Sequence, residues 1–307
     1  MKIYINNANE NWVVDRFISE WNKYNLKQTK NLHFGKKIIW IIAPWAWKKI
    51  PKRQLLKNNV LCTIHHIDED KFDNTEKNIF QERDEYVDMY HVISENTQKQ
   101  VAKLTKKPIV KIPFWVNQNI WFNIENKKSI FTEFNLSNKK FYVGSFQRDT
   151  EGSDLISPKL SKGPDQFLEI VKFLHIEKEN LEVILTGKRR NYLIKELDKA
   201  NIPYKYFEMI PYDKINKLYN ILDLYIVSSR YEGGPQSILE CAITKTPIIS
   251  TNVGIAPEIL SDESLFNMNN FKEAEANVHQ AFQNVQKYRI PKGFELFNLV
   301  FKELNEN

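Results

Sequence analysis

The sequence predicts an α/β protein built from two parallel sheets whose strands are joined by helices. Short apolar runs alternate with amphipathic stretches along most of the chain, which is typical of parallel sheets with crossover helices. The 307 residues are long for a single core and sufficient for two domains. Hydrophobic residues make up 42% of the chain, with only 9 Gly and 12 Pro, and this composition excludes disordered and fibrous classes.

The apolar runs give the expected strands in chain order. In the first part of the chain they cover residues 2–6, 38–43, 60–65, 89–94 and 109–113, and in the second part residues 141–146, 181–186, 204–210, 222–228 and 247–251. Helical periodicity is clear over residues 163–175, 213–221 and 294–301. The polar segment 117–139 has little periodicity, so we expect it to connect the domains. This places a first domain at 1–120 and a second at 121–292.

Positive charge and tryptophan are concentrated in the first domain. Residues 1–120 carry 20 Lys and Arg against 13 Asp and Glu, and all seven tryptophans lie at or before residue 121. The segment 41–53 joins Trp45 and Trp47 to four cations, a composition suited to an anionic membrane surface. The alternative is that both tryptophans belong to the core and the lysines form a solvated face.

The start of the chain has a strand pattern rather than that of a signal peptide, and no apolar run reaches the length of a membrane span. We therefore expect a cytoplasmic protein, with peripheral attachment to the inner face of the membrane as the alternative. The pI of about 9.0 admits a nucleic-acid-binding protein. However, the basic residues are spread out and no nucleic-acid module is evident, so no nucleic-acid partner is expected.

Neither cysteine has a metal-ligand neighbour in the sequence. Cys62 lies in an expected strand and Cys241 in an expected helix, so both are interpreted as buried, unpaired thiols. The sequence nearest to an Asp-x-Asp metal motif is Asp68-Glu69-Asp70, for which a solvated acidic turn is the favoured interpretation. No metal site and no resident cofactor are expected.

The segment 228–240 carries the strongest functional signal. An apolar strand ends in Ser228-Ser229, a Gly233-Gly234 pair follows, and helix periodicity begins near Pro235, which sits where a first helical residue is favoured. Backbone amides at such a turn can hold a phosphate or a sugar hydroxyl. Glu232 in the glycine loop and Glu240, two turns into the expected helix, could then accept hydrogen bonds from a polyol. The alternative is an ordinary strand-to-helix turn with two solvated glutamates.

This segment resembles the E-x7-E motif of retaining glycosyltransferases of GT-B fold, in particular glycosyltransferase family 4. The resemblance extends over most of the chain, at residues 90–94, 112–122, 142–146, 162–163, 183–187 and 252–258. It implies two Rossmann-like, doubly wound, parallel-sheet domains that face each other across a cleft. It also implies that a C-terminal helix at about 293–307 packs back on the first domain. Trp115 and Asn117 stand where the family usually has Gly and Asp.

The family pattern also implies a donor site in the second domain. Glu240 would bind the ribose hydroxyls, and Glu232 would contact the transferred sugar. The diphosphate would lie at the turn and helix start, and the base would lie near Ile210 and Tyr212. The implied donor-binding residues are Gly144, Ser145, Gly187, Ile210, Tyr212, Gly233, Gly234, Pro235, Gln236, Ser237 and Glu240.

The main departure from the family concerns the cations that grip the donor diphosphate. Ser145 occupies the usual Arg position, Arg148 follows three residues later, and an insertion at 149–161 precedes Lys162. We expect Arg148 and Lys162 to neutralise the diphosphate; the alternative is that Lys162, or Lys159, acts alone. His65, with His66 next to it, matches a family histidine near the donor sugar, and the alternative is a packed pair at a strand end.

The resemblance implies a metal-independent retaining glycosyltransferase of hexosyltransferase type, with Glu232, His65, Arg148 and Lys162 in the catalytic site. The expected donor is a nucleotide sugar, with a UDP-sugar favoured. The expected acceptor is a glycan or a lipid-linked glycan, as in the assembly of bacterial surface polysaccharide or glycoconjugate. The alternatives are a nucleotide-sugar epimerase of the same fold and a nucleic-acid-binding protein.

Overall fold

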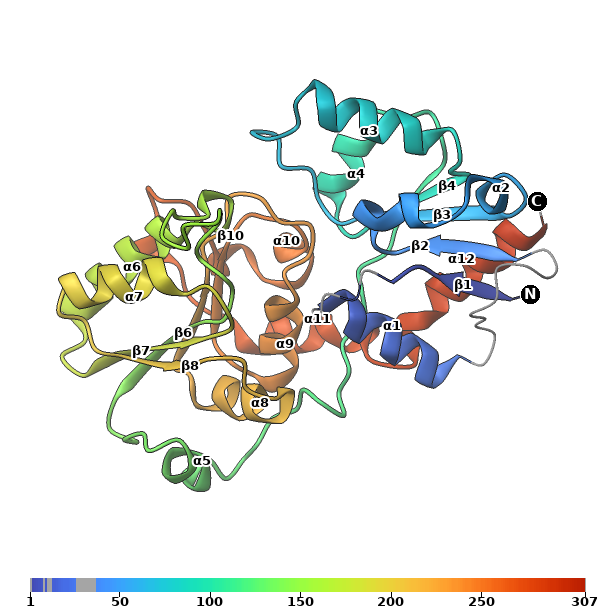
Figure 1. Cartoon of the computed structure of the whole chain (residues 1–307). Coiled ribbons are helices and arrows are strands. Elements are labelled where there is room, and N and C mark those ends of the chain that lie inside the picture. The colour runs from blue at the N-terminus through green and yellow to red at the C-terminus, as the bar shows by residue number, and fades with distance from the viewer. Residues whose placement is uncertain (1, 8, 10–12, 26–36, 307) are drawn as a thin grey trace. The chain divides into compact units, whose positions relative to one another are not determined.

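The computed structural model describes residues 2–7, 9, 13–25 and 37–306 (Figure 1). The chain divides into two compact units, residues 1–115 with 290–307 and residues 116–289. Each unit contains a parallel sheet covered by helices, which confirms the predicted α/β class. The second unit begins at Val116, whose amide donates to the Tyr288 carbonyl at 2.9 Å.

In the described part of the first unit, five parallel strands follow one another in chain order across the sheet. The strands are β1 (Ile3–Ile5), β2 (Ile38–Ile41), β3 (Asn59–Ile64), β4 (Met89–Val92) and β5 (Ile109–Lys111). The helices are α1 (Val13–Tyr24), η1 (Pro44–Lys49), α2 (Lys52–Leu55), α3 (Asn74–Asp84), α4 (Glu95–Val101), η6 (Lys292–Phe294) and α12 (Glu295–Glu306). Helices η6 and α12 come from the C-terminal part of the sequence, and they complete this unit.

Helices cover both faces of the first sheet, with α3 and α4 on one side and α1 with α12 on the other (Figure 1). The face under α1 and α12 is packed mainly with aromatic rings. The Phe297 ring on α12 is fully buried and lies within 6.1 Å of the rings of Trp21, Trp40, Phe114 and Trp115. Trp115, which departs from the family pattern, is therefore a core residue, and its indole donates to the buried Glu20 carboxylate at 2.7 Å.

A chain of hydrogen bonds crosses the same face and fixes the tautomer of His91. The Trp40 indole donates to the Thr63 hydroxyl at 2.9 Å, and the Ile112 carbonyl accepts from His91 Nε2 at 2.7 Å. Since His91 Nε2 carries the proton, Nδ1 accepts from the Thr63 hydroxyl at 2.9 Å. His91 is thus a satisfied core histidine, which is why it gave no functional signal in the sequence.

In the second unit, the described strands have the order β11-β10-β9-β6-β7-β8 and are all parallel. They are β6 (Phe141–Ser145), β7 (Leu181–Thr186), β8 (Tyr204–Phe207), β9 (Leu224–Val227), β10 (Ile248–Thr251) and β11 (Leu265–Phe266). The helices are α5 (Lys128–Glu133), η2 (Leu160–Lys162), α6 (Pro164–Glu177), α7 (Asn191–Lys199), α8 (Tyr212–Ile221), α9 (Gln236–Thr244), α10 (Ala256–Ile259), η3 (Asp262–Ser264), η4 (Phe271–Glu273), α11 (Val278–Val285) and η5 (Gln286–Tyr288). Figure 1 shows α6 and α7 on one face of this sheet and α8 to α11 on the other.

Two local strand predictions differ from the structure. β8 ends at Phe207 rather than at 210, because Met209 adopts a left-handed φ of 45° that a strand does not permit. The two-residue strand β11 was not expected, since two residues carry too little pattern. The segment 117–139, which was expected to connect the domains, packs on the second unit: the Phe122 and Ile124 amides donate to side chains of α8, and α5 lies within it.

The aromatic packing predicts that Phe297→Ala destabilises the first unit by about 3–5 kcal/mol, because it opens a large cavity among rings that cannot collapse. Denaturant unfolding followed by tryptophan fluorescence measures this, since six of the seven tryptophans precede residue 116. Leu299→Ala is the matched control, because Leu299 is 61% exposed on the same helix and its loss should change stability by less than about 0.5 kcal/mol. Equal effects of the two substitutions would contradict the packing argument.

Candidate active site

The second sheet reverses its winding between β6 and β9, and the candidate site lies at that point. β6 pairs with β9 on one side and with β7 on the other, so the chain leaves the carboxyl ends of β6 and β9 in opposite directions. Ligands of open α/β sheets bind outside the carboxyl ends of strands at such a switch point. Ser145 is the last residue of β6, and Glu232 lies in the loop that follows β9; both were singled out in the sequence.

At this point the side chains of Lys162 and Glu232 meet. The Lys162 ammonium contacts the Glu232 carboxylate, which also accepts from the Ser229 hydroxyl at 3.3 Å. Both side chains are largely buried, 20% and 10% exposed. The contact joins the turn before α6 to the glycine loop before α9, two segments that sequence analysis assigned to one donor site from their motifs alone.

Two glycines allow these loops to approach each other. A Cβ on Gly163 would lie 1.8 Å from the Ser228 carbonyl oxygen, and a Cβ on Gly254 would lie 2.4 Å from the Gly233 carbonyl oxygen. Both glycines also have left-handed φ angles, 59° and 52°. Any side chain at either position would therefore push the glycine loop away from its neighbours.

Glu240 lies behind this loop and is fixed by a tyrosine. Helix α9 begins at Gln236, with Pro235 at its N-cap rather than at its first helical position, so Glu240 lies just over one turn into the helix and not two. Glu240 is 7% exposed, and its carboxylate accepts from the Tyr219 hydroxyl at 2.9 Å. Burial raises the pKa of Tyr219 well above its usual value, so this hydroxyl remains a donor.

Arg190 is a residue of this region that the sequence analysis missed. Its fully buried guanidinium pairs with Asp149 at 3.0 Å and donates to the Ser145 carbonyl at 2.7 Å and the Thr186 carbonyl at 3.1 Å. Burial raises the pKa of Asp149, and the adjacent guanidinium opposes that shift. Arg190 thereby fixes the end of β6 and the start of the 149–161 insertion. The sequence signal for Arg190 is weak and consists of the basic run Lys188-Arg189-Arg190 after Gly187.

The remaining predicted donor residues lie around this core. Gly144 is buried in β6, where a Cβ would lie 2.3 Å from Leu222 Cδ1. The Gly187 carbonyl accepts from the Tyr206 hydroxyl at 2.8 Å. Ile210 is half-buried in the loop after β8, and Tyr212, the first residue of α8, is 41% exposed; both were expected near the base. Arg148 is exposed, and no hydrogen bond or ion pair joins it to another described residue.

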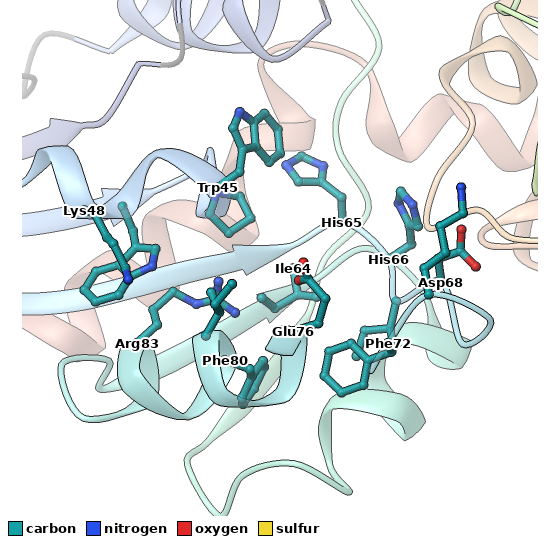
Figure 2. A pocket seen from close by; sticks show the side chains of 15 residues that line it. Trp45, Lys48, Ile64, His65, His66, Asp68, Phe72, Glu76, Phe80 and Arg83 are labelled. Carbon is teal, nitrogen blue, oxygen red and sulfur yellow. The ribbon is translucent and has the colours of Figure 1, made fainter. Parts of the chain in front are cut away.

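In the first unit, His65 lies at the carboxyl end of β3 on the wall of a cavity of about 560 Å³ (Figure 2). Because the Ile42 carbonyl can only accept, His65 Nε2 donates to it at 2.8 Å, and Nδ1 is the acceptor nitrogen. Burial lowers the pKa of His65 to about 4, so the ring is neutral at pH 7. The ring also packs beside Phe114 and Trp45, at 5.8 Å and 5.7 Å between centroids.

The two tryptophans of the 41–53 segment have different environments. Trp47 is 2% exposed and belongs to the core, whereas Trp45 is 52% exposed and lines the same cavity as His65.

Cys62 and Cys241 are buried free thiols, as predicted, and burial raises the pKa of Cys62 to about 11. Across the described residues there is no cluster of three or more His, Cys, Asp or Glu that could hold a metal ion. The described helices include none with the length and apolarity needed to cross a bilayer.

Comparison with known families identifies the switch-point unit. Residues 157–292, which contain Lys162, the glycine loop and Glu240, match the model of the family Glycosyl transferases group 1. The second unit is therefore similar to the group 1 glycosyltransferases. The match covers a little less than half of the chain and lies almost entirely within residues 116–289. No curated protein matches the sequence significantly.

Solved structures extend the likeness to both units of the chain. Anabaena HepE in complex with UDP has a TM-score of 0.73 at 11% identity, over 99% of this chain and 100% of that one. Sucrose-phosphate synthase from Thermosynechococcus elongatus has a TM-score of 0.71 at 14% identity, over 95% and 77%. S. aureus TarM, with UDP and a glycan bound, has a TM-score of 0.63 at 16% identity, over 86% and 55%. At these identities the likeness shows the fold, which is GT-B as predicted.

The two buried histidines predict how stability depends on pH. Burial lowers the pKa of His65 to about 4 and of His91 to about 3, while both titrate near 6.5 in the unfolded chain. Stability is therefore complete above pH 6.5 and falls as the pH drops toward 4, by about 1.4 kcal/mol per pH unit for each histidine. Denaturant unfolding at pH 7, 6 and 5 should show a shallower fall in His91→Gln. His279→Gln, at an exposed site, should keep the wild-type slope; an unchanged slope in His91→Gln would refute the assignment.

Proposed function

We propose that this glycosyltransferase moves a hexose from a nucleotide sugar, with a UDP-sugar favoured, to a glycan or lipid-linked glycan, with retention of anomeric configuration. A role in assembling surface polysaccharide or glycoconjugate follows from such an acceptor. The observation that carries the proposal is the contact between Lys162 and Glu232 at the switch point, with Glu240 behind it. Complexes of HepE with UDP-glucose and of TarM with UDP support the choice of donor.

The geometry favours a different role for each residue of the donor site. Glu240 is oriented by Tyr219 and is suited to the paired hydroxyls of a ribose. The start of α9 has no side-chain cap, so its first amides, together with the helix dipole, favour an anionic diphosphate. Lys162 would turn from Glu232 to the diphosphate when the donor binds, which frees the carboxylate for hydroxyls of the transferred sugar. Arg148, exposed on the loop after β6, supplies a second cation.

In the proposed reaction the bond between the sugar C1 and the diphosphate oxygen breaks while the acceptor oxygen bonds to C1 on the same face. The proton of the acceptor hydroxyl passes to the departing phosphate oxygen, so no protein nucleophile is required. Lys162, Arg148 and the amides of α9 stabilise the negative charge that develops on the leaving group. A resident metal is not part of this scheme, because these groups supply the countercharge.

His65 in the first unit is suited to orientation rather than to proton abstraction. With its pKa near 4, the neutral ring is a weak base at pH 7. Its Nδ1 can accept a hydrogen bond from a sugar hydroxyl while Nε2 remains anchored to the Ile42 carbonyl. We assign His65 to holding the reacting sugars in place.

The donor site is tested by titrating UDP calorimetrically into purified protein. Glu240→Ala should weaken UDP binding by about 10- to 100-fold, because it removes charge-assisted hydrogen bonds worth roughly 1.5–3 kcal/mol. Glu232→Ala should bind UDP nearly normally but release UDP from a panel of UDP-sugars more slowly. Glu179→Ala, at an exposed position of the same unit, is the control. Wild-type behaviour in both active-site variants would remove these roles, and conversion of the sugar without acceptor would indicate an epimerase.

We also propose that the first unit attaches peripherally to anionic membrane. The surface formed by residues 45–57 exposes Trp45, Leu56 and five cations, Lys48, Lys49, Lys52, Arg53 and Lys57. Lys48 and Lys52 share Glu82 at 2.7 Å and 3.6 Å, which leaves most of this positive charge for a partner. Exposed tryptophan beside lysine and arginine is typical of protein that lies at an anionic interface.

Vesicle sedimentation tests the attachment. The wild type should sediment with phosphatidylglycerol vesicles, should not sediment with phosphatidylcholine vesicles, and should be released by high salt, because each surface cation contributes about 1 kcal/mol. Lys49→Gln with Arg53→Gln should reduce the bound fraction. The control pair Lys103→Gln with Lys106→Gln removes the same charge from another exposed part of the unit. Equal sedimentation with both vesicle types would rule the attachment out.

A further inference from the structure

The cavity beside His65 is lined by residues of the first unit, none of which belongs to the proposed donor site of the second unit. It is bounded by η1, the end of β3, the loop that follows β3, and α3 (Figure 2). Its volume of about 560 Å³ is in the range of small-molecule sites. Trp45, Phe72 and Phe80 give it apolar walls, while Arg83 and Lys48 bring positive charge to one end. The cavity therefore suits a molecule with an apolar or sugar body and an anionic group.

Arg83, in the last turn of α3, is buried without a counter-charge. It is 7% exposed, its guanidinium lies over the Phe80 ring at 5.1 Å, and its buried Nε has no hydrogen-bond partner. Among the described residues, none forms a hydrogen bond or ion pair with this guanidinium. A buried, unpaired cation is costly, so its retention points to a partner that the protein itself does not supply.

The two acids next to Arg83 in the sequence are engaged with other side chains. Glu82 pairs with Lys48 at 2.7 Å and with Lys52 at 3.6 Å, and Asp84 accepts from the Thr105 hydroxyl at 2.7 Å. Asp68 and Glu76 also line the cavity, but neither forms an ion pair with Arg83. Figure 2 shows Asp68 and His66 at the opposite end of the cavity from Arg83 and Lys48. Positive charge thus prevails at the Arg83 end.

We propose that this cavity binds an oxyanion group of the acceptor, a phosphate or a carboxylate, with Arg83 as its anchor. The planar guanidinium can bind either group through two parallel hydrogen bonds. The remainder of the acceptor would lie along Trp45 toward His65, which is on the same cavity wall. This inference rests on the proposed transferase function and adds the chemical class of its acceptor: an anionic glycan or a lipid-linked phosphate, rather than a neutral sugar.

Thermal unfolding of Arg83→Gln, with inorganic phosphate as the probe, tests the anchor. In chloride buffer Arg83→Gln should be at least as stable as wild type, since it removes an unpaired buried charge. Phosphate should stabilise wild type and Lys77→Gln, a charge-matched control on an exposed position of α3, but should stabilise Arg83→Gln less, with an apparent Kd about tenfold weaker. A structural arginine would give the reverse, a destabilised variant with an unchanged response to phosphate, and that result would overturn the proposal.

Crystals soaked in selenate locate the anion directly. Wild type should give an anomalous peak beside the Arg83 guanidinium, and Arg83→Gln should lose it; a wild-type cavity with no peak would refute the proposal. If Arg83→Gln does not fold, Arg83→Lys keeps the charge but loses the two-pronged geometry and should show reduced selenate occupancy. UDP titration separates the two proposals, because Arg83→Gln should bind UDP normally. Failure of wild type to bind UDP would contradict the transferase proposal but would not change the meaning of the selenate result.

Phosphatidylglycerol vesicles distinguish the two sources of the anion. If the acceptor is lipid-linked, Arg83→Gln should bind these vesicles less than Lys77→Gln does. If the acceptor is a soluble anionic glycan, the two variants should bind vesicles equally while only Arg83→Gln loses selenate. Either pattern supports the anchor and identifies the carrier.

Discussion

The close approach of three backbone segments at the carboxyl ends of β6 and β9 is the constraint on which the candidate active site depends. Gly163 touches the Ser228 carbonyl and Gly254 touches the Gly233 carbonyl, at separations that no side chain permits. This packing brings Lys162 and Glu232 into contact and sets the glycine loop above α9. The two glycines thus set the positions of the charged side chains in the candidate site.

The second unit adds two supports that hold this arrangement. Arg190 and Asp149 form a buried ion pair that ties the end of β6 to the loop before α7, and Tyr219 holds the Glu240 carboxylate from α8. Each support comes from an element that does not itself line the glycine loop. Fixed polar groups of this kind lower the cost of reorganising the site as charge develops, which the proposed departure of a diphosphate would require.

Sequence patterns predicted the ten longer strands and the pairing of the two glutamates with a glycine turn, because apolar periodicity and turn chemistry are local signals. They did not reveal Arg190 or Arg83. Both depend on long-range burial: Arg190 on Asp149, 41 residues away, and Arg83 on a cavity whose walls come from four different elements. The sequence patterns also placed Glu240 too far into its helix, because Pro235 is the N-cap of α9 and not its first helical residue. Trp115 was noted only as a departure from the family, yet it is part of the aromatic core under α12.

The central claim is that the glycine loop, Lys162 and Glu240 together bind the nucleotide diphosphate of an activated sugar. The most direct measurement is a crystal structure of the second unit's site with UDP bound in the full-length protein. The account predicts the diphosphate at the start of α9 within reach of Lys162, and the ribose hydroxyls against Glu240. UDP bound elsewhere in the molecule, with the Lys162–Glu232 contact undisturbed, would contradict it.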